Sequence, residues 1–96
     1  MSLFSTLEIT SAIDLGDNAG FDYFFINAST SFDITLAETT IDGEHFWFHR
    51  IDGGSDTVEL VPFGTQTING STNNFTIPSV SQFLLISKGG GWWTVV

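Results

Sequence analysis

Residues 44–51 read Glu44-His45-Phe46-Trp47-Phe48-His49-Arg50-Ile51 and are followed by Asp52-Gly53-Gly54. Consecutive aromatic residues are typical of a β-strand, and the Asp-Gly-Gly sequence is typical of a tight turn. After this turn, residues 57–61 return to strand-forming side chains. We therefore predict a hairpin in which the strand at 44–51 pairs with the strand at 57–61.

The rest of the chain has the same character. Short runs of Phe, Ile, Val, Thr and Trp alternate with Gly, Asn, Asp and Ser, and no stretch keeps a helical apolar period over three turns. The predicted strands cover residues 4–10, 22–27, 32–36, 44–51, 57–61, 66–69, 74–77, 82–87 and 92–96. Strands of this length and spacing predict an all-β fold, an antiparallel β-sandwich or jelly-roll-like barrel of about eight short strands.

The length of 96 residues fits one domain. We expect residues 1–20 to form an N-terminal arm and first strand, and residues 21–96 to form a single β-sandwich domain. The chain has no cysteine, which excludes a disulfide or a thiolate metal site. It has neither a basic stretch before an apolar N-terminal segment nor an apolar run near the ~20 residues of a membrane span. We therefore expect a soluble protein that is made in the cytoplasm.

Eleven acidic residues outnumber the two basic ones, Arg50 and Lys88, and give a formal charge of −9. A phosphate backbone is bound through clustered Lys and Arg side chains, which this chain does not have. An anionic membrane surface is disfavoured for the same reason. The charge therefore predicts a protein partner, with no nucleic acid and no membrane.

Four segments place apolar residues at adjacent strand positions: Tyr23-Phe24-Phe25-Ile26, Phe46-Trp47-Phe48, Phe83-Leu84-Leu85-Ile86 and Trp92-Trp93. Adjacent strand residues point to opposite faces, so these strands are apolar on both faces. Either they are central strands buried within one subunit, or a second copy of the chain covers their outer faces. We favour the second interpretation. The residues expected in the oligomer interface are Phe24, Phe46, Trp47, Phe48, Phe83, Leu85, Trp92 and Trp93.

The residues capable of chemistry do not form a catalytic or metal-binding pattern. His45 and His49 would share one face of a strand with Trp47 between them, but they would lie ~13 Å apart, too far to bind one ion. The acidic stretch at 14–22 lacks the spacing of a calcium loop, and neither a nucleophile elbow nor a phosphate loop occurs. We therefore predict no catalytic residue, no metal, no cofactor and no enzymatic activity. Arg50 and Asp52 are expected to form an exposed ion pair that contributes under ~1 kcal/mol.

The second half of the chain resembles a module found in bacteriophage virion proteins, among them capsid decoration (cement) proteins and the ends of tail and fibre proteins. The resemblance lies in the order of its pieces, which are the aromatic strand from Gly43 to Asp52, Val58-Glu59-Leu60-Val61-Pro62, Gly64, Thr67-Ile68-Asn69-Gly70, the apolar strand from Phe83 to Ile86, and Gly91-Trp92-Trp93-Thr94-Val95-Val96. The resemblance implies an all-β fold that is commonly trimeric, a role in building or stabilising the virion, and no catalytic residues.

Among these virion parts, a free-standing domain with no attached repeat or coiled coil is most similar to a decoration protein. Such a protein clamps neighbouring capsomers, which implies a homotrimer on the capsid surface, made in the host cytoplasm, with the major capsid protein or another virion protein as its partner. We expect a capsid-binding arm that adds a strand to a sheet edge of the partner. The residues expected in this arm are Leu3, Phe4, Leu7 and Ile9.

Two other functions stay open. The same module occurs in small tail, baseplate or fibre proteins, which differ from a decoration protein in their location. A carbohydrate-binding module would instead use exposed tryptophans, here Trp47, Trp92 and Trp93, to stack on sugar rings.

Overall fold

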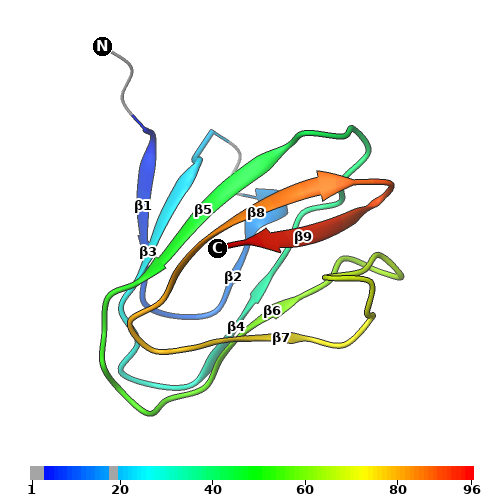
Figure 1. Ribbon diagram of the computed structural model, residues 1–96. Helices are drawn as coiled ribbons and strands as arrows, with labels where there is room; N and C mark the ends of the chain where they lie inside the picture. The colour runs from blue at the N-terminus through cyan, green and yellow to red at the C-terminus, as the bar shows by residue number, and fades with distance from the viewer. Residues whose placement is uncertain (1–3, 18–19) are drawn as a thin grey trace.

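The computed structural model describes residues 4–17 and 20–96, which form β-strands and one short 3-10 turn (Figure 1). The strands are β1 (Thr6–Ile9), β2 (Ile13–Asp14), β3 (Tyr23–Ile26), β4 (Phe32–Thr35), β5 (His45–Arg50), β6 (Val58–Val61), β7 (Phe75–Ile77), β8 (Gln82–Lys88) and β9 (Gly91–Val95), and the 3-10 turn η1 covers Leu15–Asp17. The all-β prediction is confirmed. The short β2 was not predicted, and the strand predicted at 66–69 forms only isolated bridges at Ile68.

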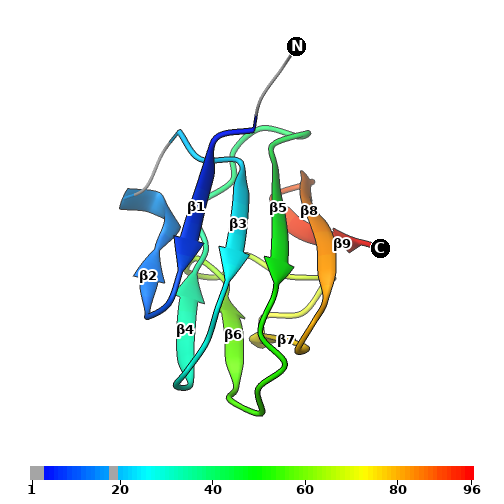
Figure 2. The same cartoon turned by 90° about the vertical axis from the view of Figure 1, so that its left-hand side faces the viewer.

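The strands make two stacked sheets, one in the order β1-β3-β5-β8-β9 and the other in the order β2-β4-β6-β7. From β1 to β6 the chain alternates between the sheets, so β1, β3 and β5 run parallel in one sheet and β2, β4 and β6 run parallel in the other (Figure 2). Strands β7, β8 and β9 then join antiparallel to their neighbours. Both sheets are thus mixed, and the expected antiparallel pairing is wrong for four of the seven strand pairs.

The predicted hairpin between residues 44–51 and 57–61 is also wrong. Strand β5 pairs with β3 and β8, whereas β6 lies in the other sheet and pairs with β4 and β7. Residues 51–57 are therefore a corner at which the chain crosses from one sheet to the other. A turn sequence predicts that the chain bends, and it leaves open which sheet the chain enters next.

Strands β1 and β2 belong to the same domain as the rest of the chain. Leu7 of β1 is paired with Phe24 of β3, and Ile13 of β2 is paired with Ile34 of β4. Ile9 is buried in the common core. Within the expected arm and first strand at 1–20, β1 and β2 thus form one edge of the two sheets that the strands of 21–96 complete.

The core lies between the sheets and consists of one cluster of apolar side chains. Its fully or almost fully buried members are Ile9, Leu15, Phe24, Ile26, Ala28, Ile34, Leu36, Phe48, Val58, Leu60, Ile68, Ile77, Phe83, Leu85 and Trp92. Trp92 is 0% exposed, and its indole Nε1 donates a hydrogen bond to the Ala37 carbonyl at 3.3 Å. The described residues include no helix with the length and hydropathy of a membrane span.

One charged side chain is buried with the core. Arg50, at the end of β5, is 2% exposed, and its Nη2 lies 3.1 Å from Asp52 Oδ2. The guanidinium also donates to the Ile77 carbonyl at 2.8 Å and to the Asp56 carbonyl at 2.7 Å. The predicted Arg50–Asp52 pair is therefore present, but it is buried where an exposed pair was expected. It ties the ends of β5 and β7 to the corner that leads into β6.

Candidate functional site

The outer side of the five-stranded sheet carries a continuous row of apolar side chains. The strand register aligns Tyr23, Trp47, Leu84 and Val95 across four neighbouring strands. Two flanking rows add Phe25 next to His49, and His45 next to Ile86 and Trp93. We call this surface the aromatic face and define it by its apolar members, which are Phe4, Tyr23, Phe25, Trp47, Leu84, Ile86, Trp93 and Val95.

The side chains of the aromatic face pack against one another along the sheet. The ring of Tyr23 lies 4.9 Å from Phe25, 5.4 Å from Phe4 and 6.3 Å from Trp47, and the planes of Tyr23 and Trp47 differ by 17°. Phe4, Trp93 and Val95 remain 56%, 42% and 48% exposed, and the other members are half-buried. The result is an apolar layer that is open to solvent, and none of the described residues forms a second layer over it.

A few polar groups lie within this layer. Gln82 Nε2 donates a hydrogen bond to the Tyr23 hydroxyl at 3.0 Å, and His49 Nδ1 lies 3.4 Å from the same hydroxyl. His45 Nδ1 lies 3.2 Å from the Gly43 carbonyl. As predicted, the two histidines flank Trp47 on one face. Within the described part of the chain, His and acidic residues nowhere gather into a group of three or more that would hold a metal ion.

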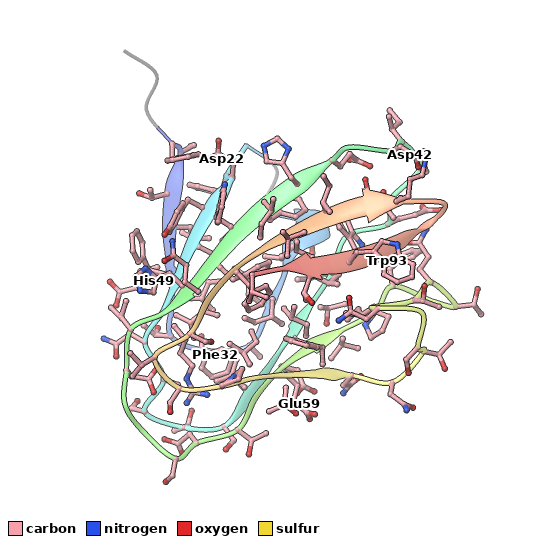
Figure 3. The ribbon with its side chains drawn as sticks, in the orientation of Figure 1. Asp22, Phe32, Asp42, His49, Glu59 and Trp93 are labelled. Carbon is pink, nitrogen blue, oxygen red and sulfur yellow. The ribbon has the colours of Figure 1, made fainter. Side chains whose placement is uncertain are left out.

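The outer side of the four-stranded sheet has the opposite character. Its register aligns Asp33, Glu59 and Thr76 in one row, and Asp14 and Thr35 in the next. The rows of the aromatic face contain one carboxylate, that of Glu8. His49 and Trp93 therefore project from an apolar sheet, whereas Glu59 projects from an acidic one (Figure 3). The molecule has one apolar and one acidic face.

Five of the eight residues expected in the oligomer interface lie instead in the core. These five, which are 0–4% exposed, are Phe24, Phe48, Phe83, Leu85 and Trp92. Phe46 is half-buried and packs against the same core. Trp47 and Trp93 lie on the aromatic face. In the other apolar runs the outward residue is the neighbour of the predicted one, namely Phe25, Leu84 and Ile86.

The residues expected in a capsid-binding arm are also distributed differently. Leu7 and Ile9 belong to β1 and pack on the core of their own chain. Phe4 lies against Tyr23 on the aromatic face, and Leu3 is outside the described residues. A deletion of residues 2–10 would therefore remove an edge strand of the sheet together with part of the core.

Two acidic residues of the predicted acidic stretch accept hydrogen bonds from the main chain. Asp14 Oδ1 accepts a hydrogen bond from the Gly16 amide at 2.8 Å, and Asp22 Oδ1 accepts one from the Ser5 amide at 2.7 Å. The surface formed by residues 4–17 and 20–96 has no pocket. The aromatic face is thus the most distinctive surface of the described molecule.

A comparison of the chain with protein-family models finds no match, and a search of curated protein sequences finds none either.

Proposed function

We propose that this chain is a structural protein of a bacteriophage virion, a capsid decoration protein that assembles as a homotrimer through its aromatic face. The observation that carries the proposal is the open apolar layer on the five-stranded sheet. Large contiguous apolar patches on a soluble domain mark interaction sites, because leaving them in water costs free energy. The resemblance of residues 43–96 to virion modules supplies the biological setting.

The distribution of charge favours a second copy as the occupant of this face. Two molecules of charge −9 repel each other. The repulsion is smallest when they meet through the surface with the fewest carboxylates, and that surface is the aromatic face. The acidic sheet would then point outward in the assembly.

The size of the aromatic face points to a modest contact. Five strands ~4.8 Å apart and about five residues long span roughly 20 by 17 Å. This footprint is smaller than the ~800 Å² that each partner buries in a typical stable complex. In a homotrimer each chain contacts two neighbours at once, so the modest contacts reinforce one another through avidity.

The proposal is tested by sedimentation equilibrium of the wild-type protein and of the double variant Leu84→Gln/Trp93→Gln. We expect the wild type at three times the 10.5 kDa of one chain, and we expect the variant to lose the trimer while it keeps its thermal unfolding transition. Val61→Gln, an apolar-to-polar change on the outer side of the other sheet, is the matched control and should stay trimeric. A wild-type monomer would contradict assembly through this face.

The virion setting needs its own test. Purified particles from a culture that carries the gene should contain the protein by mass spectrometry, and cryo-electron microscopy should place it on the capsid. Density on the tail or baseplate would favour the tail-protein alternative. A trimer that is absent from the particles would contradict a virion role and leave the assembly intact.

Carbohydrate binding is a second candidate, favoured by the nearly parallel rings of Tyr23 and Trp47 next to the polar groups of His49 and Gln82. Trp92 is buried and drops out of this candidate, which leaves Trp47 and Trp93. Quenching of tryptophan fluorescence by added glycans, abolished in Trp47→Ala, would support it. Unchanged fluorescence across a glycan panel would remove it.

A further inference from the structure

We propose that β1 pairs with β1 of a second copy, antiparallel and about a two-fold axis at Leu7, which joins the two five-stranded sheets into one. This contact lies at the edge of the sheet and does not use the aromatic face. Strand β1 is an outermost strand of its sheet, with β3 on one side and an open edge on the other (Figure 2). The inference is therefore independent of the proposed function.

The hydrogen bonds of β1 show which of its main-chain groups are free. The Ser5 carbonyl accepts from the Asp22 and Tyr23 amides, and the Ile9 carbonyl accepts from the Asn27 amide. Main-chain groups alternate in direction along a strand, so the odd residues of β1 face β3 and the even residues face away. The amides and carbonyls of Thr6 and Glu8 therefore point out of the open edge, and no described residue pairs with them.

The opposite edge of the same sheet is closed. The Trp92 amide donates to the Thr67 carbonyl, and the Trp92 carbonyl accepts from the Asn69 amide, both at 2.8 Å. The Asn69 side chain accepts from the Thr94 amide at 2.9 Å. In the other sheet, the outer carbonyl of Ile77 on β7 is bound by Arg50. Of the two edges of the five-stranded sheet, β1 is thus the one whose outward main-chain groups have no partner among the described residues.

Pairing with a second β1 follows from the register that the free groups allow. The free groups belong to the even residues, so an even residue of one strand must lie opposite an even residue of the other. The possible registers therefore place Thr6 opposite Thr6, Thr6 opposite Glu8, or Glu8 opposite Glu8. The last brings two carboxylates together, and the first leaves Glu8 opposite Phe4. The middle register pairs Thr6 with Glu8 twice, makes four main-chain hydrogen bonds, and places Leu7 opposite Leu7 on the axis.

The composition of β1 also fits a pairing edge. Strand β1 has no lysine, proline or bulge to block pairing, and the chosen register places Thr6 opposite its one charged residue, Glu8. Leu7 is half-buried at the rim of the core, and its partner's Leu7 would cover it. The two-fold axis stands perpendicular to the sheet, so both aromatic faces lie on the same side of the pair and form one wider surface.

Disulfide trapping tests this contact, because the chain contains no cysteine of its own. Four hydrogen bonds are too few to hold two free copies together at micromolar concentration, so the variants are mixed at millimolar concentration under mild oxidation. We expect a mixture of Thr6→Cys and Glu8→Cys proteins to cross-link about tenfold faster than either variant alone. Thr76→Cys, on the edge strand β7 of the other sheet, reports the rate of random collision.

A second measurement covers the event that the cysteine variants fold poorly. Hydrogen exchange at the Thr6 and Glu8 amides of the wild type should slow as the protein is concentrated, while the Thr76 amide is unchanged. The proposal would be overturned if all mixtures cross-linked at equal rates, or if one variant cross-linked fastest with itself. It would also be overturned if the exchange rates of the Thr6 and Glu8 amides did not change with protein concentration.

Discussion

Arg50 is a cation enclosed by the ends of three strands, and its partners make it the residue on which the corner after β5 depends. Its guanidinium contacts the Asp52 carboxylate and two main-chain carbonyls. Asp52 in turn accepts hydrogen bonds from the amides of Ala28, at 2.9 Å, and Gly54, at 3.2 Å. The pair thus fastens two of the crossings from the five-stranded to the four-stranded sheet, at 26–32 and at 50–58.

Replacing Arg50 by methionine should lower the free energy of unfolding by about 3–5 kcal/mol, because the Asp52 carboxylate and the carbonyls of Ile77 and Asp56 lose their donor inside the protein. Urea unfolding followed by tryptophan fluorescence measures this. Lys88→Met is the matched control, since Lys88 pairs with Asp42 on the exposed surface and its loss should leave the unfolding free energy almost unchanged. Equal effects of the two changes would contradict a buried role for Arg50.

The same pair gives the stability a defined pH dependence. Hydrogen bonding from Arg50 holds the pKa of the Asp52 carboxyl at about 2, below its ordinary value of 3.8. A folded-state pKa below the unfolded one stabilises the protein above pH 3.8, and this contribution is lost as the pH falls through 2. The loss is on the order of 2 kcal/mol. Unfolding curves of the wild type should show this loss of unfolding free energy as the pH falls from 3.8 to 2, and those of Asp52→Asn should not.

Val80 stores backbone strain on the surface. Its φ is +51°, a left-handed conformation that a β-branched residue rarely adopts, and its side chain is 69% exposed. Asparagine tolerates this conformation, so Val80→Asn should raise the free energy of unfolding by about 1 kcal/mol. Differential scanning calorimetry would detect the higher melting temperature. Val80→Ala keeps the Cβ and should gain less, and a loss of stability in Val80→Asn would contradict the strain.

At the scale of single elements, β9 starts where residues 67–69 run alongside it and bridge to Trp92. Gly91 is buried there, and a Cβ on it would lie 2.5 Å from Thr67 Oγ1 and 3.4 Å from the Thr67 carbonyl oxygen. Gly91→Ala should therefore cost about 1–2 kcal/mol of stability, and adding Thr67→Ala should recover most of it. A double-mutant cycle by urea unfolding measures the coupling. Additive effects would show that the two residues do not collide.

Strand positions were predictable from the sequence because turn residues punctuate the chain at Gly20, Gly43, Gly70 and Gly89-Gly90, where φ is positive. The short β2 was missed because Ile13–Asp14 has no strand-like run around it. Pairing was not predictable in the same way. The run at 44–51 marks a strand, but nothing in it specifies β3 and β8 as neighbours or indicates that β3 runs parallel to it.

The sequence predicts that these strands have an apolar outer face, but it does not predict which residues form that face. Runs such as Phe83-Leu84-Leu85-Ile86 are apolar on both faces, and the sequence alone does not say which face turns inward. The neighbour across the sheet decides this, as Phe83 opposite Phe48 is buried while Leu84 opposite Trp47 faces out. Burial of Arg50 was missed because its two carbonyl partners come from distant or irregular segments.

For the whole molecule, the separation of apolar and acidic faces predicts an unusual response to salt. Added salt screens the repulsion between copies of charge −9 and leaves apolar burial in place. The proposed trimer should therefore become tighter as sodium chloride is raised, with a lower dissociation constant in sedimentation experiments. Assembly that weakens with salt would mean that ion pairs, and not the aromatic face, hold the copies together.

The alternation of the chain between two sheets also has a kinetic side. Strand β1 can pair only after β3 is positioned beside it, and β2 only after β4 is. Strand β5 gains its second neighbour only when β8 is in place. Almost every pairing therefore joins segments that are far apart in the sequence. The entropy cost of closing each long loop comes before the favourable free energy of the strand contacts offsets it. Chains of such high contact order refold in milliseconds to seconds, far more slowly than helical domains of similar length. During that time the unpaired parallel strands are exposed, so rapid dilution from denaturant at low protein concentration is the way to recover the native molecule.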